Sequence, residues 1–177
     1  FLTERGREKG YTVQTLELVA QDDDGPIINS SAIRKMLAQG QVEQVRDWLG
    51  RGYSVRGTVI RGDQRGRTIG FPTANIDVWA QQIIPTNGVY AGWATVNGTR
   101  HQAVTNVGVR PTFEGDKLLT VEAHLLDFSG DLYGKQLTFS FETRLRDERK
   151  FDGIDALKSQ LSKDVQAGRE FLQALSV

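Results

Sequence analysis

An alternation of apolar and polar residues, which begins at Tyr53 and continues almost to residue 145, constrains the fold of this chain more than any other feature. A period of two is typical of strands that have one buried and one exposed face. The Asn97-Gly98 pair inside this region indicates a tight hairpin, because a type I′ turn needs two residues that tolerate positive φ. The alternation defines five candidate strands, at 53–60, 88–96, 99–107, 119–126 and 135–145.

Five or six antiparallel strands joined by turn residues predict a small barrel or sandwich. Along the last candidate strand, Leu137, Phe139 and Phe141 share one face, and Thr138, Ser140 and Glu142 share the other. A helix is expected after the strands, from about Asp152 to Leu175, with Asp152 and Asp155 at its N-terminal cap. Its apolar stripe consists of Ile154, Leu157, Leu161, Val165 and Leu172.

Residues 1–50 follow a different pattern and predict an α/β fragment. Tyr11 to Val19 alternates as a strand does, and two short helical segments follow it, at 32–40 and 41–49. One strand and two short helices bury too little surface for a core of their own. Since the helical period changes to alternation near Arg51, we expect a boundary there, with domains at 1–50 and 51–177.

Composition excludes several classes of protein. The chain contains no Cys, which removes disulfide scaffolds, thiolate metal sites and cysteine nucleophiles. Its 22 basic residues balance its 22 acidic residues, which argues against a binder of nucleic acid or membrane over its whole surface. No apolar run approaches the length of a membrane span. We therefore expect a soluble, cytoplasmic protein.

The segment 56–75 carries the densest functional pattern, four glycines and four arginines followed by Pro72-Thr73-Ala74-Asn75. Glycine lets backbone amides approach an anion and arginine supplies countercharge, so phosphate binding is one interpretation, and a solvated hairpin loop is the other. The segment is neither a P-loop nor a dinucleotide fingerprint. Thr73 and Asn75 share a face if the segment is extended, and their oxygens suit Mg²⁺, although such a pair also occurs at turns and strand edges.

Glu122 is the second candidate functional residue. It lies in an alternating segment, on the same face as Thr120 and His124. A carboxylate beside a bound phosphate can act as general base for a hydroxyl nucleophile. The alternative is an ordinary outward-facing strand glutamate. The chain's two histidines, His101 and His124, lie on separate candidate strands without metal-ligand spacing, so we expect structural roles for both.

Five ordered motifs resemble those of the riboflavin kinase family, in particular the kinase module of bacterial bifunctional riboflavin kinase/FMN adenylyltransferases, also called FAD synthetases. They are GRTIGFPTAN at 66–75, GVYAGW at 88–93, NVGVRPTF at 106–113, VEAHLLDFSGDLYGK at 121–135 and LRDERKF at 145–151. The resemblance covers about residues 52–177. It implies a mainly β fold, a six-stranded antiparallel Greek-key barrel with a C-terminal helix, and transfer of the ATP γ-phosphate to riboflavin, which gives FMN and ADP.

The resemblance also implies roles for individual residues. Glu122 matches the catalytic glutamate, and Thr73 and Asn75 match the Mg²⁺ and phosphate contacts of the PTAN motif. The remaining matches are to the ATP-binding loop (Gly62, Arg67 and Gly70) and to segments that line or close the flavin site (Asn106, Arg110 and Arg146).

Residues 1–50 resemble the end of an adenylyltransferase domain. The segment INSSAIR at 28–34 is similar to a nucleotide-binding signature, in which Ser30, Ser31 and Arg34 at a helix N-terminus would suit the phosphates of a second ATP. The HxGH motif of adenylyl transfer is missing. We therefore expect this chain to make FMN but not FAD, and a longer parent, if there is one, to supply the remaining adenylyltransferase domain.

Two other functions stay open at this point. One is a barrel that binds flavin without catalysis. The other is a barrel that binds single-stranded nucleic acid, with the arginines at 51–67 as countercharge and Trp79, Tyr90 and Trp93 as stacking surfaces. The kinase interpretation predicts small-molecule partners only, namely riboflavin, ATP and their products, and neither nucleic acid nor membrane.

Overall fold

The computed structural model describes residues 1–15, 26–111 and 117–175, and the chain divides into two compact units, Phe1–Ser30 and Ser31–Val177. In the first unit, helix α1 (Leu2–Lys9) ends at Gly10, whose φ of 78° lets its amide bond back to the Gly6 carbonyl at 2.8 Å. The sequence did not predict α1, because its residues show no helical spacing of apolar side chains. Of the strand expected at 11–19, residues 11–15 form neither helix nor strand, and residues 16–19 lie outside the described residues.

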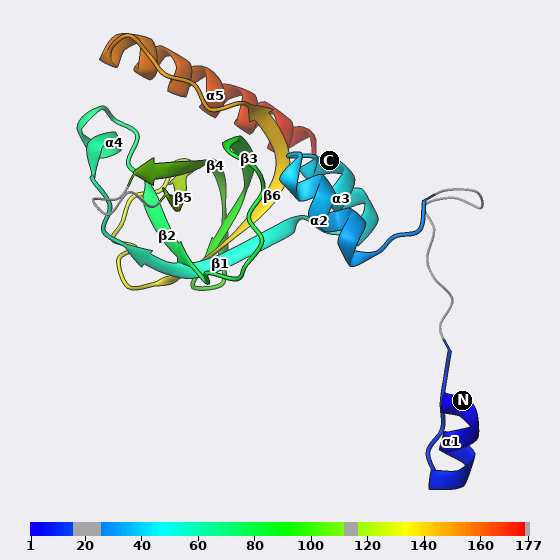
Figure 1. Ribbon diagram of the computed structural model, residues 1–177. Coiled ribbons are helices and arrows are strands. Elements are labelled where there is room, and N and C mark those ends of the chain that lie inside the picture. The colour runs from blue at the N-terminus through cyan, green and yellow to red at the C-terminus, as the bar shows by residue number, and fades with distance from the viewer. Residues whose placement is uncertain (16–25, 112–116, 176–177) are drawn as a thin grey trace. The chain divides into compact units, whose positions relative to one another are not determined.

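The second unit is built on a closed antiparallel barrel with the strand order β1-β2-β5-β4-β3-β6 (Figure 1). Because β2 pairs with β5 instead of β3, strands β2 to β5 form a Greek key, and the predicted six-stranded barrel is confirmed. The strands are β1 (Tyr53–Ile60), β2 (Ala74–Val78), β3 (Gly88–Val96), β4 (Thr99–Pro111), β5 (Lys117–Leu125) and β6 (Gln136–Arg146).

Strand β2 is the strand that alternation did not define, since it has only five residues. The β3–β4 hairpin is confirmed, because Asn97 and Gly98 have φ values of 50° and 78°, as a type I′ turn requires. Strand β4 runs beyond the predicted end at residue 107 to Pro111, where it still pairs with β5.

The core fills the barrel and extends to two helices beside it. Leu137 and Phe139 are completely buried inside the barrel. Helices α2 (Ser30–Ala38) and α3 (Val42–Leu49) add Leu37, Val42 and Val45 to the same core. The compact unit therefore begins at Ser31, ahead of the boundary expected near Arg51, because these short helices bury their apolar faces against the barrel.

Helix α5 (Ile154–Ala174) follows β6, as expected, and packs on β3, β4 and β6 (Figure 1). Gly168 allows the close approach, since a Cβ there would lie 2.9 Å from a methyl group of Val104. The expected stripe is wrong at Ile154, which is 64% exposed, and Gly153 instead of Asp152 caps the helix. None of the helices in the described ranges is long and apolar enough to cross a membrane.

Candidate active site

The loop between β1 and β2 folds back on the start of β2. It contains the short helix α4 (Arg65–Thr68), which sequence patterns did not predict. Gly62 lies against the side chain of Asn75, so that a Cβ at residue 62 would overlap the Asn75 amide. Gly70 adopts a φ of 91°, a conformation that favours glycine. The position of Gly62 thus has a steric reason, and the position of Gly70 a conformational one.

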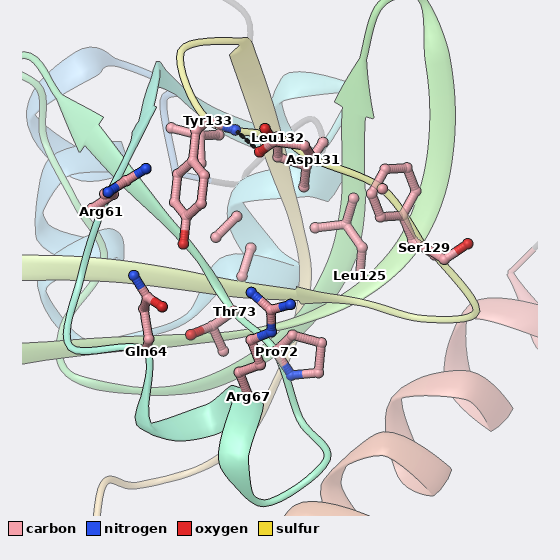
Figure 2. Close-up of a pocket in the computed structure, with 15 residues that line it drawn as sticks. Arg61, Gln64, Arg67, Pro72, Thr73, Leu125, Ser129, Asp131, Leu132 and Tyr133 are labelled. Atoms are coloured by element: carbon pink, nitrogen blue, oxygen red, sulfur yellow. Dashed lines mark hydrogen bonds between the residues drawn. The ribbon is translucent and has the colours of Figure 1, made fainter.

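A cavity of about 670 Å³ opens between this loop and the β5–β6 connection (Figure 2). That volume lies within the usual range for small-molecule sites. Of the predicted ATP-binding residues, Arg67 and Thr73 line the cavity. Sequence reasoning did not single out Tyr133, whose ring lies 5.4 Å from the Arg61 guanidinium carbon, or Phe128. Their signal was the pair of aromatic residues in the FSGDLY part of a family motif.

Beside this cavity, a row of polar side chains crosses the outer face of the barrel. Glu122 on β5 is the register partner of Asn75 on β2 and of Asn106 on β4. Register partners point to the same side of a sheet, and the buried Val121 and Ala123 fix the opposite side as the interior. The barrel therefore places a carboxylate between two carboxamides.

Thr73 completes this arrangement from the end of the β1–β2 loop. Its hydroxyl donates to Glu122 Oε2 at 3.5 Å. Thr73 also lines the cavity, so it links the polar row to the cavity. The structure thus brings together four of the predicted site residues, Thr73, Asn75, Asn106 and Glu122.

The β6–α5 connection reaches the far end of the row. Glu148 Oε1 accepts a hydrogen bond of 3.5 Å from Asn106 Nδ2 and lies over Gly108, where a Cβ would be 2.6 Å from that oxygen. Sequence reasoning did not single out Glu148, because it lies in a run of charged residues that is typical of a solvated turn.

For the other two predicted flavin residues, Arg146 and Arg110, the structure shows no direct contact with the polar row among the described side chains. Arg146 donates from Nε and Nη2 to Asp164 on α5, at 2.7 to 3.1 Å, and from Nη1 to the Asp147 carbonyl. All three of its guanidinium nitrogens are therefore engaged within the protein. The backbone of Arg110 pairs with Leu118, and its side chain lies outside the described residues.

The remaining candidate residues lie in other parts of the fold. Ser30 and Ser31 begin α2, and Arg34 lies exposed in the next turn. Tyr90, one of the three aromatic residues that the nucleic-acid alternative needs as stacking surfaces, is completely buried in the barrel, so the alternative is wrong for this residue. Within the described ranges, no group of three or more His, Cys, Asp or Glu residues could hold a metal ion. A metal at the polar row would therefore have to use hydroxyl and carboxamide oxygens as well.

Fold and site together define a closed antiparallel barrel that has an oxygen-rich polar row beside a cavity, with a glycine- and arginine-rich loop at the edge of that cavity. A family model described as Flavokinase: Riboflavin kinase matches residues 49–172. The chain belongs to the riboflavin kinase family.

Individual relatives agree with this assignment. The bifunctional riboflavin kinase/FMN adenylyltransferase of Listeria monocytogenes is 43% identical over 148 residues, which is 84% of this chain and 47% of that protein. The chain spans about half the length of the curated relatives it matches. The crystal structure of riboflavin kinase from Trypanosoma brucei aligns with a TM-score of 0.53 and 29% identity, over 70% of this chain and 81% of that one.

A second solved structure is more similar in fold. It is described as a macrolide-efflux protein from Streptococcus pneumoniae and aligns with a TM-score of 0.81 and 34% identity. The alignment covers 90% of this chain and 52% of that one.

Proposed function

We propose that this chain is a riboflavin kinase domain, which transfers the γ-phosphate of ATP to the ribityl 5′-hydroxyl of riboflavin to give FMN and ADP. The observation that carries the proposal is the position of Glu122, in register between Asn75 and Asn106 and in contact with Thr73 at the cavity. This arrangement has the parts that phosphoryl transfer needs, namely a base for the hydroxyl and oxygen ligands beside a phosphate pocket.

Glu122 acts as the general base in this proposal. The hydroxyl oxygen of the ribityl chain attacks the γ-phosphorus, and the bond to the oxygen that bridges the β- and γ-phosphorus atoms breaks. The hydroxyl proton passes to the Glu122 carboxylate. Most of the rate enhancement then comes from positioning and charge stabilisation, because phosphoryl transfer needs little covalent help from the protein.

The polar row also fits a magnesium ion. Thr73 offers a hydroxyl oxygen and Asn75 a carboxamide oxygen, and Mg²⁺ prefers such hard oxygen ligands. The geometry supports this assignment, because both residues lie beside the proposed base: the Thr73 hydroxyl donates to Glu122 Oε2, and Asn75 is the register partner of Glu122. When bound with ATP, Mg²⁺ supplies positive charge that offsets the negative charge of the phosphates.

In this proposal, ATP binds in the cavity. Arg67 in α4 supplies positive charge for the phosphates, and Gly62 and Gly70 let the loop backbone lie close over them. A loop that covers the nucleotide also excludes water, so that ATP is not hydrolysed in place of transfer.

The flavin lies on the Asn106 side of Glu122. Asn106, Arg110 and the segment that begins at Arg146 form this part of the proposed site. For Arg146, the ion pair with Asp164 supports a role in anchoring that segment to α5.

We also propose a role for residues 1–50 and a cellular compartment for the reaction. Ser30, Ser31 and Arg34 belong to the remnant of an adenylyltransferase nucleotide site, and the other part of that domain is the partner in a full-length parent. The kinase reaction takes place in the cytoplasm, where ATP and Mg²⁺ are available.

One assay tests the proposed function. The chain is incubated with riboflavin, ATP and Mg²⁺, and the products are separated by chromatography. FMN without FAD is the expected result. No FMN, together with binding of riboflavin, would leave a flavin-binding barrel without kinase activity. Salt-dependent binding of an oligonucleotide with no binding of riboflavin would favour the nucleic-acid alternative.

A further inference from the structure

We propose that His124 is a positioning residue of the kinase site, which holds the Pro72 carbonyl and thereby places Thr73 and Asn75 against Glu122. This inference rests on the proposed function. It concerns a residue outside the polar row, for which the sequence predicted only a structural role.

The contact that carries the inference is short and specific. His124 Nδ1 lies 2.7 Å from the Pro72 carbonyl oxygen, and the His124 ring meets the ring of Phe71 edge-on, with 5.6 Å between ring centroids. A carbonyl oxygen can only accept a hydrogen bond, so Nδ1 carries the proton in this contact. The imidazole thus holds the residue that immediately precedes Thr73.

The backbone at this point needs such support. Strand β2 pairs with β5 at only two positions, Ala74 with Ala123 and Asn75 with Glu122. Thr73 precedes the first of these pairs, and Pro72 has no amide hydrogen, so its carbonyl is the only polar backbone group it can offer. The next register position on β5 is that of His124. Its side chain therefore provides a hydrogen bond where the strand ladder stops.

The consequence for the site follows from geometry. Thr73 Oγ1 is already 3.5 Å from Glu122 Oε2, at the limit of a hydrogen bond. A further displacement of residues 72 and 73 would break this contact and move the threonine oxygen away from the phosphates. A displacement of about 1 Å can cost on the order of 100-fold in rate.

Two substitutions separate the donor from the ring. His124→Asn keeps an N–H donor near the position of Nδ1, and His124→Phe keeps a planar ring against Phe71 but removes the donor. We expect His124→Phe to lower kcat/KM for ATP at least about 10-fold, mostly by raising KM for ATP, and to leave riboflavin binding unchanged. His124→Asn should remain within about 3-fold of the wild type, since it keeps the hydrogen bond.

The matched control is His101→Phe. His101 is the other histidine of the chain, and its ring meets Phe128 of the cavity edge-on, at 5.1 Å between centroids, a contact that a phenylalanine ring would keep. Its replacement by a ring should leave KM for ATP unchanged. Equal losses for His124→Asn and His124→Phe, or wild-type kinetics for His124→Phe, would overturn the proposal.

Amide hydrogen exchange tests the positioning without substrate. Residues 73–75 should exchange faster in His124→Phe than in the wild type, and His124→Asn should restore the slow exchange. Unchanged exchange in His124→Phe would overturn the proposal. A wild-type chain that forms no FMN would instead overturn the proposed function, and the exchange comparison would still decide whether His124 holds the segment.

Discussion

The two walls of the barrel each carry a glutamate, and the two glutamates have different surroundings. We call the outer face of β2 and β5 the open wall, and the outer face of β1, β6 and β3, where helices α3 and α5 pack, the covered wall. On the open wall, Glu122 is partly exposed and lies in register with two carboxamides. On the covered wall, Glu142 is only 4% exposed, accepts a hydrogen bond from Ser140 and lies within 4 Å of two arginine side chains.

The difference shows how neighbours decide what a carboxylate can do. Guanidinium groups neutralise Glu142 and satisfy its oxygens, which suits a structural role. The neighbours of Glu122 include the Thr73 hydroxyl and two carboxamides, which suits the proposed role of its carboxylate as a base for a hydroxyl proton. Helix α3 completes the covered wall, since its Glu43 accepts from the Thr143 hydroxyl and the Arg144 amide at 2.5 and 2.8 Å.

The largest expected effect comes from Glu122→Gln. The substitution keeps the size of the side chain but removes the base, so FMN formation should fall by about 100-fold or more. Stability should change little. The measurement is turnover at saturating riboflavin and ATP, together with binding of both substrates. The control is Glu142→Gln, which should keep normal turnover, and equal losses in the two variants would end the distinction between the walls.

The next effect concerns Asp164, which binds Arg146. Asp164 is 3% exposed, and Asp164→Ala would leave the guanidinium, with 18% of its side chain exposed, without its carboxylate partner. Breaking a buried ion pair in this way costs about 3 kcal/mol of the free energy of unfolding. Denaturant unfolding measures this loss. Normal stability with a strongly raised KM for riboflavin would show that Arg146 acts mainly on the flavin.

On the covered wall, Glu142→Gln should lower stability by a smaller amount. The amide can still accept from Ser140, but the charge that offsets Arg46 and Arg100 is gone. Because both arginines remain partly hydrated, the expected loss is about 1 to 2 kcal/mol. The same denaturant unfolding experiment measures it, and it should be insensitive to Mg²⁺ and ATP. A loss of FMN formation without a loss of stability would place Glu142 in the site.

Asn75→Ala tests the metal part of the open wall. Removal of the carboxamide oxygen should raise the Mg²⁺ concentration needed for half-maximal FMN formation by about 3- to 10-fold, as expected for the loss of one polar contact of about 1 kcal/mol. An unchanged Mg²⁺ titration would remove Asn75 from the metal site.

Much of the barrel could be predicted because its strands alternate. Strands β1 and β3 begin and end where the pattern placed them. The pattern did not define β2, because five residues are too few to show a period. It also did not reveal that α2 and α3 share the barrel core, because the apolar face of a helix does not indicate which element it packs against. Residue chemistry made Glu122 and Asn75 candidates beside ordinary alternatives, and the family motifs gave each of them a specific expected role. Their juxtaposition depends on the register between β2 and β5, which no local pattern encodes.

The smallest expected effect links the end of β5 to α5. Asp127 has a φ of 54°, and its carboxylate accepts hydrogen bonds of 2.7 and 3.1 Å from Arg169. The hydrogen bonds from Arg169 lower the pKa of this exposed carboxyl below its ordinary value. Asp127→Asn removes the charge but keeps a residue that tolerates positive φ, so any effect reports on the ion pair and not on the backbone.

The direction of the pH dependence follows from the lowered pKa. The unfolded chain takes up the Asp127 proton at a higher pH than the folded protein, so the ion pair contributes its full stability above the ordinary carboxyl pKa of about 4. That contribution is lost as the pH falls through the folded-state value. The unfolding free energies of the wild type and Asp127→Asn should therefore differ at pH 7, converge in acid and also converge in high salt, because salt screens exposed charges. A difference that persisted in acid would show that Asp127 stabilises the end of β5 through its backbone conformation, not through its charge.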